Sequence, residues 1–159
     1  MTSSAPTPSH ARRALVFGAS GAIGAALLVR LRDAGWHVDA LSRAPRAAGP
    51  QLRWHTGAFS EMPDTLPAQV DAIFSCGPLD RFSLWYADAA IACPRVVAFG
   101  STSDATKQAA RDPDERELAQ RLRASGERVS AAARTRGAAA TLLRPTLVYG
   151  SGRDRNLSL

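Results

Sequence analysis

Three glycines near the amino terminus form the pattern with the clearest chemical meaning in this sequence. Gly18, Gly21 and Gly24 follow the short apolar run Ala14 to Phe17, and a helical pattern starts near Gly21. Gly18 allows a sharp backbone turn, Gly21 allows the backbone to approach a ligand, and Gly24 leaves room between helix and strand. Free N–H groups at the start of the helix favour an anion. The segment Leu15 to Gly24 therefore predicts a cradle for a pyrophosphate.

The glycine spacing is G-x-x-G-x-x-G rather than the commoner G-x-G-x-x-G of dinucleotide-binding folds. Its position between an expected strand and an expected helix favours a dinucleotide site. The alternative is a tight strand-to-helix connection that binds nothing.

A second chemical signal lies about twenty residues after the glycine turn, where an NAD-binding fold places an acid that holds the ribose hydroxyls. This sequence has Ser42 and Arg43 there instead, with Arg46 close behind. A guanidinium group matches the oxygens of a phosphate, so Arg43 indicates NADP through its 2′-phosphate, with NAD as the other candidate. The alternative is a solvent-exposed loop arginine, which is common in so arginine-rich a chain.

The elements that must position these residues alternate between strands and helices. We expect six strands, at residues 14–17, 36–41, 51–56, 70–75, 95–99 and 140–143. We expect helices at 21–34, 83–92 and about 112–136, the last with Gly126 as a candidate kink. This alternation predicts an α/β fold, a doubly wound parallel sheet with strand order 3-2-1-4-5-6.

That strand order places the ends of several strands at one edge of the sheet. Five short segments follow strands there, at 18–24, 42–43, 58–59, 76–77 and 101–102. A dinucleotide would lie across the point where strands one and four are neighbours. This shared edge is the main reason to expect that the turn glycines serve a ligand.

Length and composition limit the class of protein. The 159 residues, 45% of them hydrophobic and 21% charged, fit one globular domain. We expect a disordered lead at 1–13, without the features of a secretory signal, and one NAD(P)-binding domain at 14–159. Cys76 and Cys93 fit neither a metal site nor a disulfide framework, which favours the cytoplasm and no metal. No apolar run is long enough to span a membrane.

The net charge of +6 comes from 20 basic residues, of which only Lys107 is a lysine. The arginines are scattered and mixed with acids rather than gathered on one face with aromatics. This distribution favours a solvated surface over nucleic-acid binding. The charge supports only weak attraction for anionic ligands.

Three segments in this order resemble the extended and atypical short-chain dehydrogenases/reductases, most closely the NAD-dependent epimerase/dehydratase branch. They are Val16 to Gly24, Phe99 to Ser103 and Leu143 to Gly150, and the resemblance covers about Ala14 to Asn156. The resemblance implies a Rossmann fold that binds NAD(P). It also implies oxidoreductase or epimerase chemistry on a small-molecule substrate of unknown identity.

The resemblance also implies roles for single residues. Ala58 and Phe59 would flank the adenine, Cys76 and Gly77 would pass the ribose next to the nicotinamide, and Thr102 would polarise the substrate's carbonyl or alcohol. The residues expected to bind the cofactor are Gly18, Ser20, Gly21, Ala22, Ile23, Gly24, Ser42, Arg43, Ala58, Phe59, Cys76, Gly77, Ser101, Pro145 and Thr146.

Two features depart from the pattern of that family. Its acid/base pair is Tyr-x-x-x-Lys on the helix after the fifth strand, but Ala119 and Arg123 stand at those places. Family members also continue into a small substrate domain that covers the nicotinamide, and this domain is missing from a chain that stops at Leu159. The chain is then either a truncated relative or one whose open side is covered by a second copy or a partner chain.

These observations leave three hypotheses open. The first is an NADP-dependent oxidoreductase or epimerase-like enzyme that uses Thr102. The second is a non-catalytic NADP(H)-binding sensor or scaffold, and the third is a remnant that folds poorly because its sheet is incomplete. A serine hydrolase is excluded because Ser20 lacks the last glycine of a nucleophile elbow, and because His37 and His55 lie in strands, where we expect structural roles.

Overall fold

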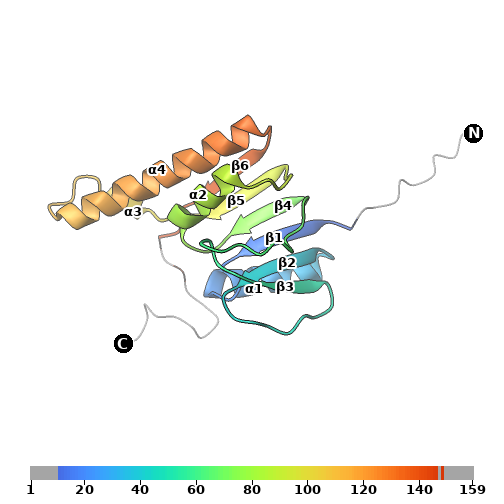
Figure 1. Cartoon of the computed structure of the whole chain (residues 1–159). Coiled ribbons are helices and arrows are strands. Elements are labelled where there is room, and N and C mark those ends of the chain that lie inside the picture. The colour runs from blue at the N-terminus through green and yellow to red at the C-terminus, as the bar shows by residue number, and fades with distance from the viewer. Residues whose placement is uncertain (1–10, 147, 149–159) are drawn as a thin grey trace, which may run out of the picture.

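The structure, a computed structural model, describes residues 11–146 and 148. It contains a six-stranded parallel sheet in the order β3-β2-β1-β4-β5-β6 (Figure 1). The strands are β1 (Arg13–Phe17), β2 (His37–Ser42), β3 (Leu52–Thr56), β4 (Ala72–Ser75), β5 (Arg95–Phe99) and β6 (Ala139–Leu143). The helices are α1 (Ala22–Asp33), α2 (Leu79–Asp88), α3 (Ser103–Thr106) and α4 (Pro113–Thr135). The predicted doubly wound order is confirmed, and each predicted strand end lies within two residues of the observed one.

Helices cover both faces of the sheet, with α1 on one face and α2 and α4 on the other (Figure 1). Successive residues of a strand point to opposite faces, so a strand covered on both sides is apolar throughout. Residues 14–17 of β1 are accordingly all fully buried. The α1 side buries Ala14, Val16, Ala19, Leu28, Leu31, Val38 and Ala40. The core on the other side includes Leu15, Phe17, Ile73, Phe82, Tyr86, Val96 and Val129.

The helix that follows β4 begins at Leu79 and ends at Asp88, so the predicted range of 83–92 was wrong at both ends. Its buried residues are Leu79, Phe82, Ser83 and Tyr86. They follow the i, i+3, i+4, i+7 spacing of a helix with one face on the core. The helix therefore starts directly after Pro78, which carries no N–H to donate, and its first turn lies close to the end of β4.

Helix α4 continues without interruption past Gly126, which is therefore not a kink. Gly126 is buried, and a Cβ built there would lie only 3.1 Å from Cδ1 of Leu142 in β6. The missing side chain thus lets α4 lie close to the sheet. The start of α4 is capped as predicted, because the side chain of Asp112 accepts a hydrogen bond from the backbone N–H of Asp114 (2.9 Å).

The predicted disordered lead at residues 1–13 includes three residues that the structure describes, Ala11, Arg12 and Arg13. Arg13 is the first residue of β1, and its backbone N–H donates to the carboxylate of Asp71 (2.7 Å). The guanidinium group of Arg12 lies 4.7 Å from the ring centre of Trp36. The domain therefore starts before Ala14, and residues 1–10 lie outside the described part. None of the helices within residues 11–146 is long and apolar enough to cross a membrane.

Candidate functional site

Two of the three turn glycines are required by the packing of the chain on itself. Gly18 has a φ of +68°, and a Cβ there would lie 2.6 Å from the carbonyl carbon of Cys76 at the end of β4. A Cβ on Gly24 would overlap the carbonyl oxygen of Gly18 and lie 2.7 Å from Cα of Ala19. The first turn of α1 therefore packs directly against the end of β1, as the glycine spacing predicts.

Gly21 differs from its two neighbours in the motif. It is the N-cap of α1 with a φ of −76°, and the only atom that a Cβ would approach is the carbonyl oxygen of Gly18, at 3.3 Å. No side chain caps the helix at this end. The first N–H groups of α1 are therefore available to an anionic ligand, and the surrounding chain restricts position 21 less than it restricts positions 18 and 24.

A cavity of about 340 Å³ opens above this turn, at the carboxyl ends of β1 to β4. Nine predicted site residues line it: Gly18, Ser20, Gly21, Ser42, Arg43, Ala58, Phe59, Cys76 and Gly77. Five further lining residues were not predicted: Phe17, Leu41, Gly57, Pro78 and Arg81. The fold thus brings together residues that lie up to 64 positions apart in the sequence, from Phe17 to Arg81.

The polar side of the cavity is basic. Arg43 and Arg81 line it, and its lining contains no carboxylate. Next to Arg43, the buried Ser42 hydroxyl accepts hydrogen bonds from the backbone N–H of Ala44 (3.3 Å) and from Nε of Arg46 (3.2 Å). The guanidinium group of Arg46 also lies 5.1 Å from the ring centre of Trp54. Ser42 therefore organises the turn after β2 and binds Arg46, which does not itself line the cavity.

The apolar side of the cavity is aromatic. The Phe17 ring stacks on Phe59 with ring centres 5.2 Å apart, and Trp85 supports Phe17 from α2 at 4.5 Å. Burial raises the pKa of the Cys76 thiol to about 11, so this side chain is protonated and neutral at pH 7. A flat apolar group and an anion can therefore occupy different ends of the same cavity.

The remaining predicted residues do not line this cavity. Ala22, Ile23 and Gly24 lie in the first turn of α1. Ser101 and Thr102 follow β5, and Pro145 and Thr146 follow β6, at the same edge of the sheet. These two segments are joined by the hydrogen bond from Gly100 N–H to the Leu143 carbonyl (2.7 Å) and by the ion pair of Arg144 with Asp104 (2.7 Å).

The described residues provide no tyrosine–lysine pair for acid/base chemistry. Ala119 of α4 is fully buried, and Arg123 is paired with Glu127 (3.3 Å) on the exposed side of the helix. Tyr86 lies within the core, and Lys107 is paired with Glu115 (2.7 Å). Tyr149 lies outside the described residues. No group of three or more His, Cys, Asp or Glu side chains in residues 11–146 is placed to hold a metal ion.

Arg81 is the most informative residue that sequence reasoning missed. It lies in the first turn of α2, which the sequence placed before the start of a helix at residue 83. The apolar residues Leu79, Phe82 and Tyr86, spaced i, i+3, i+7, carry the signal that could have found it, because they predict a helix that begins next to the end of β4.

No family model matches the sequence, and no curated protein matches it either. Solved structures match its fold. MoeE5, solved with UDP-glucuronic acid and NAD, has a TM-score of 0.68 at 22% identity, over 91% of this chain and 58% of MoeE5. The enzyme WbmH of Bordetella bronchiseptica, solved with NAD⁺, has a TM-score of 0.65 at 16% identity, over 94% of this chain and 59% of WbmH. The chain has a Rossmann fold.

A third similar structure is a short-chain dehydrogenase/reductase superfamily protein from Agrobacterium tumefaciens with bound NAD. Its TM-score is 0.61 at 19% identity, and the match covers 84% of this chain and 48% of that protein. This chain therefore spans less than 60% of the length of each of these structures. The shared part is the Rossmann fold with its turn between β1 and α1.

Proposed function

We propose that this protein binds NADP(H) in the cavity above the β1–α1 turn and belongs to the short-chain dehydrogenase/reductase superfamily, in its epimerase/dehydratase branch. The observation that carries the proposal is Gly21. A Cβ at position 21 would make one tight contact, 3.3 Å to the carbonyl oxygen of Gly18, rather than the overlaps found at positions 18 and 24, and position 21 lies at the uncapped start of α1 and lines the cavity. A pyrophosphate that approaches the backbone closely accounts for the missing side chain.

The preference for NADP rests on the basic rim of the cavity. In an NAD site, a carboxylate after the second strand accepts hydrogen bonds from the ribose hydroxyls. Here Arg43 and Arg81 line the cavity, and no carboxylate is present in its lining. The 2′-phosphate of NADP would bind to Arg43, and the adenine would lie between Ala58 and Phe59. NAD, with which the similar structures above were solved, is the alternative.

Two functions fit such a site. In an oxidoreductase or epimerase-like enzyme, the nicotinamide supplies hydride chemistry, Pro145 and Thr146 lie near its ring, and Thr102 polarises the substrate oxygen. The second function is an NADP(H)-binding sensor or scaffold without turnover. A specific observation favours the second function, because the described residues offer no tyrosine–lysine pair to exchange the proton.

Replacement of Arg43 tests the choice of cofactor. We expect Arg43→Ala to weaken NADPH binding at least about tenfold and to leave NADH binding nearly unchanged, because a hydrogen bond between charged groups contributes about 1.5–3 kcal/mol. Isothermal titration calorimetry with both nucleotides measures this difference. Arg134→Ala, at an exposed arginine of the last turn of α4, is the matched control. Equal losses for NADPH and NADH would show that Arg43 does not contact the 2′-phosphate.

A further inference from the structure

Arg81 is a cation at the candidate dinucleotide cavity to which the proposed function gives no role. It is an exposed residue in the first turn of α2, and it lines the cavity. Within the described residues, its side chain makes no hydrogen bond or ion pair. Asp80 precedes it, but consecutive helix residues do not face each other, and Asp80 does not line the cavity. The residues three and four positions from Arg81 are all uncharged: Gly77, Pro78, Leu84 and Trp85.

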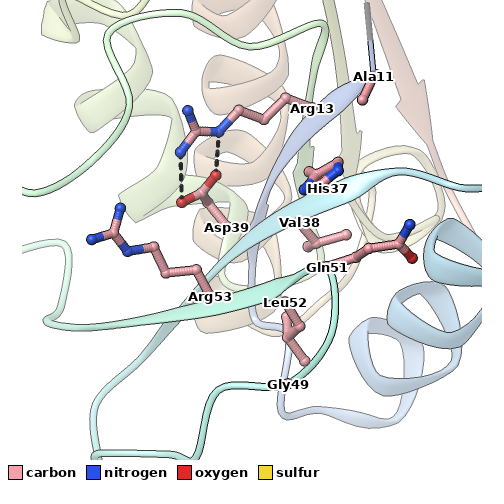
Figure 2. A pocket seen from close by; sticks show the side chains of 9 residues that line it. All are labelled: Ala11, Arg13, His37, Val38, Asp39, Gly49, Gln51, Leu52 and Arg53. Atoms are coloured by element: carbon pink, nitrogen blue, oxygen red, sulfur yellow. Dashed lines mark hydrogen bonds and ion pairs between the residues drawn. The ribbon is translucent and has the colours of Figure 1, made fainter.

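An arginine at the opposite edge of the sheet has its charge balanced by the chain itself. A cavity of about 490 Å³ lies there, and Figure 2 shows Arg13 in it, facing the carboxylate of Asp39. The guanidinium group of Arg13 donates to both oxygens of this carboxylate, at 2.6 and 3.1 Å. The lining of the dinucleotide cavity contains no carboxylate, so Arg43 and Arg81 are left to attract an anionic ligand.

The strand order places Arg43 and Arg81 on opposite sides of the glycine turn. Strand β1 lies between β2 and β4, Arg43 follows β2, and Arg81 belongs to the helix that follows β4. Neighbouring strands are about 5 Å apart, so the end of β4 lies one spacing from the β1 turn and two from the end of β2. The link from β4 to α2 touches this turn, because a Cβ on Gly18 would lie 2.7 Å from the nitrogen of Gly77. Arg81 lies about one helical turn beyond that contact.

The starts of two helices also meet at this cavity. Neither α1 nor α2 has a side chain that caps its first N–H groups, and their N-cap residues, Gly21 and Pro78, both line the cavity. Unpaired N–H groups give the start of a helix a partial positive charge. The glycine turn therefore has positive charge beside it both from α1 and from the first turn of α2, where Arg81 lies.

We propose that Arg81 binds the diphosphate of the nucleotide together with the N–H groups of α1, while Arg43 binds the 2′-phosphate. This inference rests on the proposed function, because it takes the ligand to be a dinucleotide at the β1–α1 turn. Arg43 then distinguishes NADP from NAD, whereas Arg81 binds a group that both nucleotides carry. Two phosphates offer enough oxygens for the α1 N–H groups and for a guanidinium fork. The site should therefore bind a nucleoside 5′-diphosphate more tightly than a 5′-monophosphate.

Calorimetric titration of the full chain with NADPH and NADH tests the role of Arg81. We expect Arg81→Gln to raise the dissociation constants of both nucleotides by the same factor, at least about fivefold, because water screens part of an exposed charged hydrogen bond. Arg81→Lys, which keeps the charge but not the fork, should give a smaller loss. Arg134→Gln removes the same charge from an exposed position in the last turn of α4. This matched control should change each constant less than twofold.

Titration with ADP and AMP identifies the group that Arg81 contacts. Both lack a 2′-phosphate, and only ADP carries a diphosphate. The natural chain should prefer ADP to AMP, and Arg81→Gln should remove most of this preference. Arg43→Ala should leave the preference unchanged. The fold of Arg81→Gln should persist because no described partner is lost, and urea unfolding measures this.

The possible outcomes separate this inference from the proposed function. If the natural chain binds neither NADPH nor ADP, both are wrong. If it binds NADPH and Arg81→Gln binds NADPH as tightly, only the role of Arg81 is wrong. A loss confined to NADPH would assign Arg81 to the 2′-phosphate, and an equal loss for ADP and AMP would assign it to the adenosine monophosphate part. Either of these two results overturns the inference.

Discussion

Gly18, Gly21 and Gly24 belong to one sequence motif, but each is glycine for a different physical reason. Gly18 adopts a positive φ against the end of β4, and Gly24 lets helix α1 contact the end of β1. Both are therefore needed for the fold itself. Gly21 has an ordinary φ, and a Cβ there would make one tight contact, 3.3 Å to the Gly18 carbonyl oxygen, so packing restricts this position less than the other two.

This difference predicts opposite behaviour for two alanine variants. Gly24→Ala should destabilise the protein by about 3 kcal/mol or more, because its Cβ overlaps backbone atoms that cannot move aside cheaply. Gly21→Ala should cost at most about 1 kcal/mol, the loss expected at an N-cap, yet weaken NADPH binding more than tenfold. Urea denaturation and calorimetric titration measure the two quantities. Unchanged NADPH affinity in Gly21→Ala would contradict a pyrophosphate at this turn.

At the scale of elements, a buried ionic network joins the first three strands. Arg13 of β1 and His55 of β3 both hydrogen-bond Asp39 of β2, and Nδ1 of His55 lies 2.9 Å from Oγ1 of Thr65 in the connection to β4. Burial alone would raise the pKa of Asp39, but hydrogen bonds from Arg13 and His55 outweigh it and lower the pKa below its ordinary value of 3.8. The carboxylate is thus more favourable in the folded chain than in the unfolded one.

A lowered folded-state pKa makes part of the stability depend on pH. The contribution of Asp39 is fully present above its unfolded pKa of about 3.9 and is lost as the pH falls through the lower folded value. Asp39→Asn should therefore cost about 2 kcal/mol at pH 7, because it weakens the charged hydrogen bonds to the buried His55 and to Arg13, whose side chain is 39% exposed. The difference in the free energy of unfolding between Asp39→Asn and the natural protein should become smaller below about pH 4. At that pH Asp39 of the natural protein is protonated and, like the asparagine, carries no charge.

Chemical denaturation between pH 3 and pH 7 measures this narrowing. Asp64→Asn, at an exposed aspartate in the same connection, is the matched control and should give a small difference that does not narrow. If the free energies of unfolding of Asp39→Asn and the natural protein differ by the same amount across this pH range, ionisation of Asp39 does not stabilise the fold.

At the scale of the whole molecule, the candidate dinucleotide cavity is lined from the ends of four strands and from α2. The strands share one continuous sheet, and the aromatic residues Phe17 and Phe82 link the cavity floor to the core under α2. A ligand in the cavity should therefore stabilise the chain as one unit rather than one segment of it.

Thermal and urea unfolding with NADPH test this expectation. The described residues should unfold in one cooperative transition, and NADPH at one hundred times its dissociation constant should add about 2.7 kcal/mol to the free energy of unfolding. Gly21→Ala, which we expect to bind NADPH more than tenfold more weakly, should gain less than about 1.4 kcal/mol at the same NADPH concentration. Separate transitions for the two halves of the sheet would contradict a single unit, and a remnant that folds poorly would show no cooperative transition.

One face of the sheet carries α1, and β6 forms one edge of the sheet. Among the described residues α1 is the only helix on that face, and its core residues pack over β1 and β2. Leu143 at the end of β6 is 41% exposed. Coverage of the open carboxyl-terminal side, next to β6, by a second copy or by another chain remains a prediction, for which sedimentation of the purified protein is the measurement.

The sequence by itself determined the strand order, the turn at Gly18 and nine of the residues around the cavity. It could do so because apolar runs, glycine spacing and capping residues such as Asp112 act locally, and because parallel strands must gather their carboxyl ends at one edge. The start of α2 and the position of Arg81 became clear from the tertiary structure, because the buried face of that helix depends on its packing against the sheet and α4. The sequence did not predict the pairing of Arg13, Asp39 and His55 either, because these residues become neighbours only through the register of three strands.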